Sequence, residues 1–523
     1  MSAEPVAIDG EPLAIAGKDH GVGRSPLPAM LAFLGDLADT GIRHCAWKSN
    51  EHLLAALAGQ TDVDLLVDRG DRARFEALVS RHGLRRVLPP PADVHPGMDH
   101  YLGLDRPSGR LFHLHVHFQL VLGERYVKNH RLPIERELLE RTRTLHGVAV
   151  PTADLELAVL VVRALLKYRA RDVVKDVLHV RSPGIAAETL AELEWLRGNR
   201  DLAAIRPGLD AIGSVVPLDV VTSFLEVIAN DPRRGVHLLR LRTRLRWALR
   251  PLRRHGRMRA GAAYAHALWR RRRPPRRRDA PRMTLPCGGT TVALVGADGA
   301  GKTTVAADVA RWLGWKLDVR VHYLGSKAPS PPTDWLYLGF RALRRSHRAA
   351  TERVGERSHA ARSIAALRDL ALALHHVSVG LDRRRHHACA QRDAAGGAIV
   401  VFDRYPLARL SDRPEDRLLD GPQVADLVGP RSGRLTDALA AVEERIYQRF
   451  GLPDHLVLLD VDPVVAARRK PDHRIDVIRT KTRAAAKLAG LAEAAGAPVT
   501  RVDANQALDL VILDLKARLW DVL

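Results

Sequence analysis

The residues best suited to chemistry lie between Gly296 and Thr304, where the chain reads Gly-Ala-Asp-Gly-Ala-Gly-Lys-Thr-Thr. This run is a complete G-x-x-x-x-G-K-[ST] phosphate loop, whose glycines let successive backbone N–H groups curl around a phosphate. Lys302 would reach the β- and γ-phosphates, and the Thr303 hydroxyl would ligate Mg²⁺. The pattern predicts a nucleoside triphosphate site. The predicted phosphate-binding residues are Gly296, Ala297, Asp298, Gly299, Ala300, Gly301, Lys302, Thr303 and Thr304.

A second chemical motif ends the apolar run Gly397-Ala-Ile-Val-Val-Phe-Asp-Arg-Tyr-Pro406. The run predicts a buried strand whose carboxyl end lies beside the phosphate loop. At that place Asp403 can hold Mg²⁺ through water, and the Arg404 guanidinium can bind the phosphate of an acceptor. The alternative is an ion pair at the end of a strand, without a role in chemistry.

These motifs need a sheet that brings them together. Alternating strands and helices after residue 286 predict the βαβ rhythm of a doubly wound parallel sheet, and thus an α/β fold. The predicted strands are 291–296, 318–324, 397–403, 455–461 and 498–502.

The phosphate loop, Asp403-Arg-Tyr405 and Asp454-His-Leu-Val-Leu-Leu-Asp-Val-Asp-Pro463 resemble motifs of the thymidylate kinase family of nucleoside monophosphate kinases. The resemblance covers about 286–523. It implies a P-loop kinase domain that uses ATP and Mg²⁺ on a small-molecule phosphate acceptor. It further implies that Asp298 contacts the acceptor sugar, that Arg404 holds the acceptor phosphate, and that Tyr405 belongs to the acceptor site.

The basic stretch Arg468-Arg-Lys-Pro-Asp-His-Arg474, with Arg479 after it, falls where that family has an arginine-bearing lid. Lid arginines would neutralise charge on the transferring phosphoryl group. The alternative is a solvated basic helix end. The predicted catalytic residues are Lys302, Asp403, Arg404, Arg468 and Arg474.

The chain departs from the family near the acceptor. The family carries an Arg-Glu-Pro-Gly segment after its second strand, whereas this chain has His322-Tyr-Leu-Gly-Ser-Lys327, followed by Pro329-Ser-Pro-Pro332. A long arginine-rich helical insertion then precedes Gly397. Three functions stay open: a nucleoside monophosphate kinase, a kinase for a sugar or lipid-linked saccharide, and a non-catalytic ATP-gated scaffold.

The N-terminal part offers a second site. Asp62 and Asp64 lie at i and i+2 on a predicted strand, so both carboxylates project from one face and could share Mg²⁺. With Trp47-Lys-Ser-Asn50 upstream, this resembles the minimal nucleotidyltransferase fold, although Lys48-Ser49 replaces the usual Gly-Ser. The matching strand offers a row of histidines in place of a third acid: His113, His115 and His117. A nucleotide- or metal-binding domain, the same fold without activity and an unrelated α+β domain all stay open.

Composition and periodicity divide the 523 residues into segments. The fold prediction is a C-terminal P-loop kinase domain with a doubly wound parallel sheet, preceded by an α+β nucleotidyltransferase-like domain with a helical extension. The predicted segments are a tail at 1–25, the α+β domain at 26–150, helices at 151–250, an arginine-rich linker at 251–285 and the kinase-like domain at 286–523. Within the first two domains, strands are expected at 42–47, 62–67, 100–104 and 110–120, and helices at 71–82, 152–170, 172–180, 186–197 and 217–230.

The net charge of the chain indicates which kinds of binding partner are favoured. The net charge of +22 favours anionic partners, and the basic amphipathic stretch 237–278 could lie on an anionic membrane surface. Its alternative is a solvated linker, and the family resemblance gives no support for a nucleic-acid partner. A homodimer stays open.

The compartment is predicted from what the sequence lacks. Three distant cysteines form neither a disulfide framework nor a metal cluster, and no secretory leader or uncharged membrane-length apolar run is found. A cytoplasmic location is therefore expected.

Overall fold

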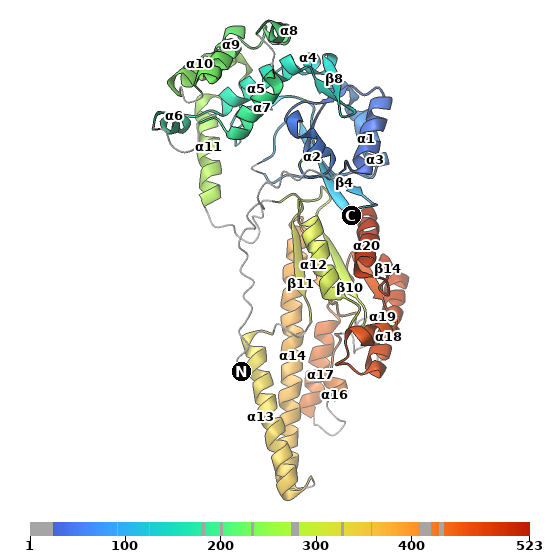
Figure 1. Ribbon diagram of the computed structural model, residues 1–523. Coiled ribbons are helices and arrows are strands. Elements are labelled where there is room, and N and C mark those ends of the chain that lie inside the picture. Colours follow the sequence, from blue (N-terminus) through green and yellow to red (C-terminus); the bar gives the residue numbers. More distant parts are fainter. Residues whose placement is uncertain are drawn as a thin grey trace.

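The computed structural model describes most of the chain (Figure 1). The described residues are 25–91, 93–124, 126–178, 184–198, 202–231, 235–272, 282–325, 329–356, 358–407, 410, 420–427 and 434–523. The predicted tail, except for residue 25, and positions 273–281 of the predicted linker lie outside these residues.

The C-terminal part contains a five-stranded sheet in which every neighbouring pair is parallel. Its order is β11-β12-β10-β13-β14, so the first strand in sequence lies at the centre. The bounds are β10 Thr290–Val295, β11 Val319–Tyr323, β12 Ile399–Asp403, β13 His455–Asp460 and β14 Val499–Asp503. The predicted α/β fold and all five predicted strands are confirmed.

Helices cover both faces of this sheet because both faces are apolar. Val292 and Leu294 of β10 pack on one face against α12 Lys302–Leu313 and α20 Leu508–Val522. Ala293 and Val295 face the other way. That second face is covered by α14 His359–Ala395, α17 Arg434–Tyr447 and α19 Ile475–Ala494. Such burial on both faces is typical of a doubly wound sheet.

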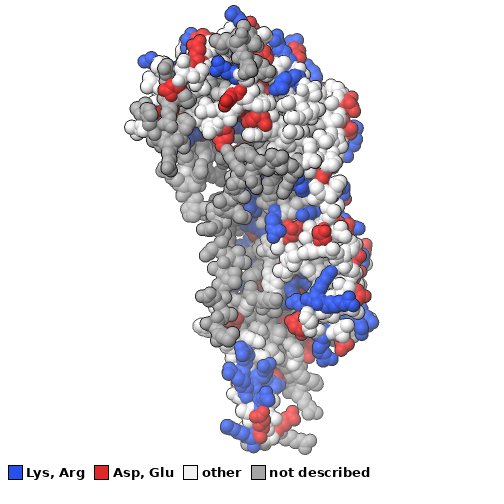
Figure 2. All heavy atoms as spheres, viewed as in Figure 1, with Lys and Arg blue, Asp and Glu red and all other residues white. Residues whose placement is uncertain are grey.

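The predicted arginine-rich insertion forms a long helical hairpin of α13 Pro331–Val354 and α14 (Figure 1). On the face seen in Figure 2, lysine and arginine side chains gather near its far end. By length and composition alone, α14 is the one helix among the described residues that could cross a membrane. Only 22% of its apolar window is buried, although its C-terminal half packs on the sheet and on α17.

The N-terminal part is a mixed-sheet α+β domain with the order β1-β2-β5-β4-β3. β2 and β5 are parallel, and the other neighbours are antiparallel. The predicted hairpin around Pro107 and the predicted helix at 71–82 are confirmed. The bounds are α1 Pro28–Asp39, β1 His44–Ala46, α2 Leu53–Leu57, β2 Val63–Val67, α3 Arg72–Arg81, β3 Arg85–Val87, β4 Met98–Asp105 and β5 Arg110–His117.

A helical extension follows. It includes α8 and α10, which the sequence analysis did not delimit, and α11, which lies inside the predicted linker. The bounds are β6 Val121–Leu122, β7 His130–Arg131, α4 Glu135–Glu140, β8 Thr142–Leu145, β9 Val148–Pro151, α5 Ala153–Lys167, α6 Ala170–Val177, α7 Ala187–Arg197, α8 Leu202–Ile212, α9 Leu218–Asn230, α10 Gly235–Ala248 and α11 Arg257–Arg272. The described residues of the C-terminal part also form the short helices α16 Val424–Leu427 and α18 Pro463–Arg469.

The N-terminal sheet and the C-terminal domain share a hydrophobic core. Leu104 and Leu111 of the β4-β5 hairpin belong to the same buried cluster as Leu515 and Trp520 of α20. The Trp520 indole N–H also donates a hydrogen bond of 2.9 Å to the Gly83 carbonyl. This contact fixes the orientation of the last helix against the N-terminal domain.

Replacement of Trp520 by alanine tests this interface. The residue is 3% exposed, so Trp520→Ala should lower the free energy of unfolding by about 3 kcal/mol through lost burial and a cavity. Denaturant titration followed by circular dichroism would measure the loss. The control is Trp335→Ala, since Trp335 is 76% exposed and its removal should cost less than about 0.5 kcal/mol. Equal losses would contradict the described packing.

Candidate functional site

The phosphate loop joins the central strand β10 to α12, and its shape requires glycine. Gly296, Gly299 and Gly301 have φ angles of 153°, 89° and 91°, which side chains rarely adopt. A Cβ on Gly299 would lie 2.5 Å from the Ala466 carbonyl oxygen, so α18 packs directly on the loop. The loop backbone is therefore held between the sheet and the segment predicted to be a lid.

Lys302 lies inside the loop. Its ammonium donates to the carbonyls of Gly296, at 2.9 Å, and Ala297, at 2.8 Å. The side chain is buried, and burial together with the nearby Arg404 charge lowers the pKa of Lys302 to about 8. Lys302 thus places a desolvated cation where a phosphate would bind, and the two carbonyl contacts hold it there.

Asp298 joins two cationic side chains and a histidine to the loop. Its carboxylate contacts the Arg404 guanidinium at 3.1 Å and the Lys481 ammonium at 2.6 Å, and the His473 ring lies 3.9 Å away. Burial by itself would raise the pKa of Asp298. The hydrogen bond and charge of Lys481, with the charges of Lys302 and Arg404, outweigh it and hold the pKa well below its usual range. Asp298 is therefore ionised, and its negative charge holds the Arg404 and Lys481 side chains next to the loop.

Arg404 has a φ of +74°, in the left-handed region that non-glycine residues seldom occupy. This conformation follows directly after β12. It leaves the guanidinium between Asp298 of the loop and Asp420, whose carboxylate is 3.5 Å away. Backbone strain of this kind persists where the surroundings enforce it, and it is common at functional sites.

Asp420 is itself held by a buried arginine. Arg383 of α14 donates to the Asp420 carbonyl at 2.7 Å, and its guanidinium lies 3.2 Å from the Asp420 carboxylate. The Arg383 guanidinium also donates a hydrogen bond of 2.5 Å to the Tyr447 hydroxyl. A chain of alternating charges thus runs from the loop through Arg404 and Asp420 into the helical insertion.

Asp403 ends β12 next to the loop strand, where it pairs with Leu294. The carboxyl group is buried, and its Oδ1 has no hydrogen-bond partner among the described residues. Because Mg²⁺ prefers oxygen ligands, a metal-bound water would satisfy this oxygen. Thr303 is exposed at the start of α12, so both predicted metal residues fit Mg²⁺ in the type of their donor atoms.

Tyr405 belongs more to the core than to an open site. Its hydroxyl donates to the Gly451 carbonyl at 2.8 Å and contacts the His387 ring at 2.9 Å. Its ring packs on Phe402 and Phe450. The residue lines a small hollow together with Lys302 and Arg404.

The predicted lid arginines lie beside the loop. Arg468 is on α18, and Arg474 precedes α19, where its guanidinium lies 3.4 Å from Asp476. Arg468, Arg474 and Arg479 are exposed.

The segment that departs from the thymidylate kinase pattern is tied to the helical insertion. His322 contacts Asp393 at 3.1 Å, and Asp382 accepts hydrogen bonds from the Ser330 backbone and the Thr333 hydroxyl. Residues 326–328 lie outside the described residues. A small hollow between Tyr323, Asp382 and Arg383 adjoins the charge network through Arg383.

The N-terminal site has a different charge arrangement. Asp62 and Asp64 share one face, as predicted, but each is bound to a lysine. Lys48 lies 2.8 Å from Asp64, and Lys316 of the C-terminal domain lies 2.7 Å from Asp62. Burial raises the pKa of Asp64, but Lys48 and the neighbouring histidines hold it well below the usual value. The acids are thus already neutralised by the protein.

The predicted histidine row is confirmed as one face of β5, and β4 adds His100 to it. His113 contacts Asp62 at 2.9 Å and His100 at 3.2 Å. Potential ligand atoms of His100, His113 and His115 lie within 4.8 Å of one another. Burial lowers the pKa of His113 to about 4, which favours the neutral form that binds metals. Three imidazoles suit Zn²⁺ or Cu²⁺ better than Mg²⁺.

Comparison with known proteins gives distant similarity. No family model matches the chain. The chain is 28% identical over 199 residues to the "Uncharacterized ATP-binding protein YghR" of Escherichia coli strain K12, covering 38% of this chain and 75% of that protein. The protein of that name from Escherichia coli O6:H1 matches to the same extent. The chain is thus a distant homologue of a protein named as ATP-binding.

Among solved structures, deoxyadenosine kinase from M. mycoides with bound dCTP matches 44% of this chain and 98% of its own. The identity is 13% and the TM-score is 0.28. Individual site residues cannot be transferred at this level. The C-terminal domain is P-loop kinase-like in its own sheet order and loop.

Several residues of the site were missed by sequence reasoning. Lys481 and Asp420 carry no local motif, and Arg383 lies in the insertion, where many arginines look alike. A signal existed for His100, because it lies at the start of a predicted strand opposite the histidine row. The others required the tertiary structure.

The shape of the loop can be tested at Gly299. Gly299→Ala would force a Cβ against the Ala466 carbonyl and strain the φ angle of +89°, so ATP affinity should fall at least about tenfold. Calorimetric titration would measure it. The control is Gly339→Ala in α13, where a Cβ would meet no atom within 4 Å, and its affinity should be unchanged. Equal affinity in both variants would contradict the described loop.

The lowered pKa of Lys302 predicts proton uptake when phosphate binds. The free loop loses the Lys302 proton as pH rises through about 8, whereas a bound phosphate favours the charged ammonium. ATP binding at pH 9 should take up close to one proton, and at pH 7 almost none from this group. Calorimetry in buffers of different ionisation enthalpy measures this number. Lys302→Arg, which stays charged, should abolish the uptake, and equal uptake in both proteins would refute the assignment.

Proposed function

We propose that the protein is an ATP-dependent phosphotransferase of the thymidylate kinase-like type. It would transfer the γ-phosphoryl group of ATP to a nucleoside monophosphate or a related phosphate-bearing acceptor. The observation that most supports this proposal is the position of Arg404. It has a strained backbone conformation, and its guanidinium lies between the carboxylates of Asp298 in the loop and Asp420. The name of the distant homologue, an ATP-binding protein, supports the donor side.

In this proposal the Lys302 ammonium would donate to the phosphates of ATP in place of the Gly296 and Ala297 carbonyls. Thr303 and Asp403 would hold Mg²⁺, which supplies neutralising charge between the phosphates. The Arg404 guanidinium would leave one of its carboxylate partners, Asp298 or Asp420, and bind the acceptor phosphate instead. Arg468 and Arg474 would close over the transferring phosphoryl group. Such catalysis consists mainly of positioning and charge neutralisation.

The alternatives remain an acceptor that is a sugar or lipid-linked saccharide, and a scaffold that binds ATP without transfer. The altered segment after β11 and the long α13–α14 hairpin border the acceptor side, which favours an acceptor other than thymidine monophosphate. The strained Arg404 favours transfer over a scaffold, because ATP binding alone gives no reason to hold a guanidinium beyond the loop.

For the N-terminal domain we propose a nucleotidyltransferase-like fold without ordinary two-Mg²⁺ chemistry. Lys48 and Lys316 occupy the carboxylates that such chemistry would need for metal. The cavity of about 270 Å³ next to Asp62 and Asp64 is large enough for a small ligand.

The donor side is tested at Lys302. Lys302→Ala should lower the rate of ATP-dependent transfer by about 10²–10³-fold, because one preorganised cation at the phosphates is lost. ADP release in a coupled assay measures the rate, and circular dichroism checks the fold. Lys175→Ala, a half-exposed lysine of the helical extension, should keep full activity. Near-normal turnover in a folded Lys302→Ala protein would exclude the phosphate loop as the donor site.

The acceptor side is tested at Arg404. Arg404→Ala should raise the acceptor KM or lower kcat by roughly tenfold or more, with little change in ATP affinity, because a charge-assisted contact to the acceptor is removed. Steady-state kinetics with each substrate varied separates the two effects. Arg348→Ala, whose side chain is 84% exposed on α13, serves as the control. If ATP affinity fell while the acceptor KM stayed constant, Arg404 would belong to the donor site.

A further inference from the structure

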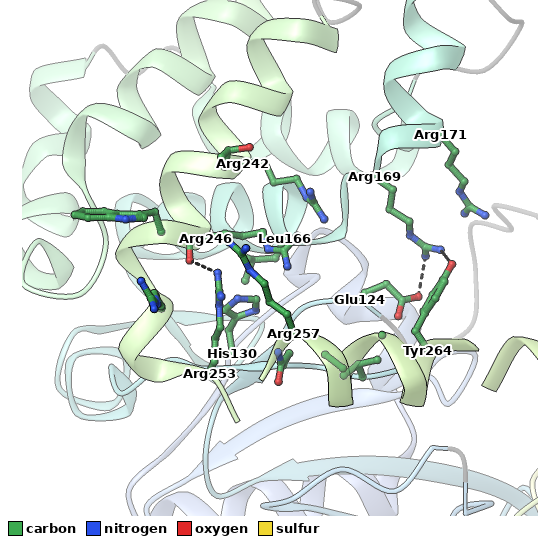
Figure 3. A pocket seen from close by; sticks show the side chains of 17 residues that line it. Glu124, His130, Leu166, Arg169, Arg171, Arg242, Arg246, Arg253, Arg257 and Tyr264 are labelled. Carbon is green, nitrogen blue, oxygen red and sulfur yellow. Dashed lines mark hydrogen bonds and ion pairs between the residues drawn. The ribbon is translucent and has the colours of Figure 1, made fainter. Parts of the chain in front are cut away.

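A cavity of about 680 Å³ lies in the N-terminal half, away from the phosphate loop. It is bordered by α10, α11, the start of α6 and the segment around Glu124 and His130 (Figure 3). Cavities of this volume typically hold small molecules. No described residue of the C-terminal domain lines it, so it is separate from the proposed phosphotransfer site.

Arginine dominates the lining of this cavity. Among the lining residues that the structure describes, Glu124 is the one carboxylate, and Arg169 lies 3.0 Å from it. Among the described residues, no carboxylate lies within ion-pair distance of Arg242, Arg246 or Arg253. Arg171 also lines the cavity, and its Nε lies 3.6 Å from the Asp172 carboxylate. The remaining lining arginines are Arg242, Arg246, Arg250, Arg253 and Arg257. The cavity thus carries a large excess of positive charge.

Several hydrogen-bonding groups in the wall lack acceptors. His130 is only 5% exposed, and neither ring nitrogen has a hydrogen-bond partner among the described residues. The same holds for the buried Nε atoms of Arg242 and Arg253. Burial, and then the charges of Arg246, Arg253 and Arg242, lower the pKa of His130 to about 4. Unsatisfied buried donors and a positive potential both favour an anion.

The cavity also has an apolar side. Leu166 and Val127 contribute to the lining, and the Tyr264 ring is fixed by a 2.8 Å hydrogen bond from Arg169 to its hydroxyl. Trp247 stands at the border and is 74% exposed. An organic group next to the anion would contact these side chains.

We propose that this cavity binds a small molecule carrying two or more phosphate groups on an organic body. Guanidinium groups bind phosphate oxygens in pairs, and a single phosphate offers too little charge for this many arginines. The same chemistry is found in soluble polyphosphorylated compounds and in the head groups of phosphorylated lipids. The binding site is the cavity itself, and not the basic outer surface of the helices.

The probe is inorganic tripolyphosphate, titrated calorimetrically into full-length Lys302→Ala protein, in which binding at the phosphate loop is weakened. The double substitution Arg242→Ala and Arg246→Ala should weaken binding at least about tenfold for each arginine. The matched control is Arg240→Ala with Arg259→Ala, which removes the same charge from α10 and α11 at exposed positions outside the cavity lining. This control should change the affinity less than about twofold. Equal weakening by both pairs, or no binding before substitution, would overturn the proposal.

Two further experiments distinguish a loss of binding from a loss of the fold, and a lipid ligand from a soluble one. Arg242→Lys with Arg246→Lys keeps the charge but loses the paired N–H groups, so a folded variant should bind with intermediate affinity. Vesicles of phosphatidylcholine carrying a bisphosphorylated phosphoinositide are compared with phosphatidylserine vesicles of equal charge. Binding only to the phosphoinositide, with competition by tripolyphosphate, indicates a lipid head group, and tripolyphosphate binding alone indicates a soluble ligand. Equal binding to both vesicles, unaffected by the cavity pair, would overturn the proposal.

Discussion

The contact between Asp298 and its cations is the interaction on which the C-terminal site depends. This carboxylate lies in the phosphate loop and holds Arg404 from the end of β12 and Lys481 from α19. Without it, those two side chains and Lys302 would repel one another in a partly buried space. Asp298 therefore lets one domain collect positive charge before any phosphate arrives. A bound phosphate would compete for the same cations, so binding and rearrangement of the network are coupled.

The fold makes this contact available. In a parallel sheet the carboxyl ends of all strands meet at one edge, so the loop after β10 and the residues after β12 are neighbours. α18 then packs on Gly299, and α19 brings Lys481 over the loop. The N-terminal domain uses the opposite arrangement, in which the acids Asp62 and Asp64 are held by lysines and histidines. The C-terminal site therefore has cations that a phosphate could bind, whereas the acids of the N-terminal site are already paired with lysines.

The parts that could be predicted from sequence are local or periodic. The loop residues carry their own signature, and the apolar runs before Gly296 and Asp403 fix two adjacent strands of the sheet. The i, i+2 spacing of Asp62 and Asp64 was enough to place both acids on one face. In each case neighbours in sequence determine the structure.

The parts that could not be predicted depend on distant neighbours. Lys481 reaches Asp298 only because α19 packs across the loop, and Arg383 reaches Asp420 only because α14 lies along the sheet. α11 was missed because its many arginines resemble a linker, and its packing next to α10 and the Glu124 segment makes the cavity. A basic amphipathic stretch followed by an arginine-rich linker was expected there, whereas several of those arginines line a cavity.

Transfer of radiolabel from γ-labelled ATP by the purified full-length protein tests the central claim most directly. A panel of nucleoside monophosphates, sugar phosphates and lipid-linked saccharides is offered with Mg²⁺, and labelled products are counted against ADP formed. If the protein is a phosphotransferase, at least one phosphate-bearing class receives label in equal amount to the ADP released. Tight binding of ATP with no transfer to any class would contradict it and would leave a scaffold that binds ATP.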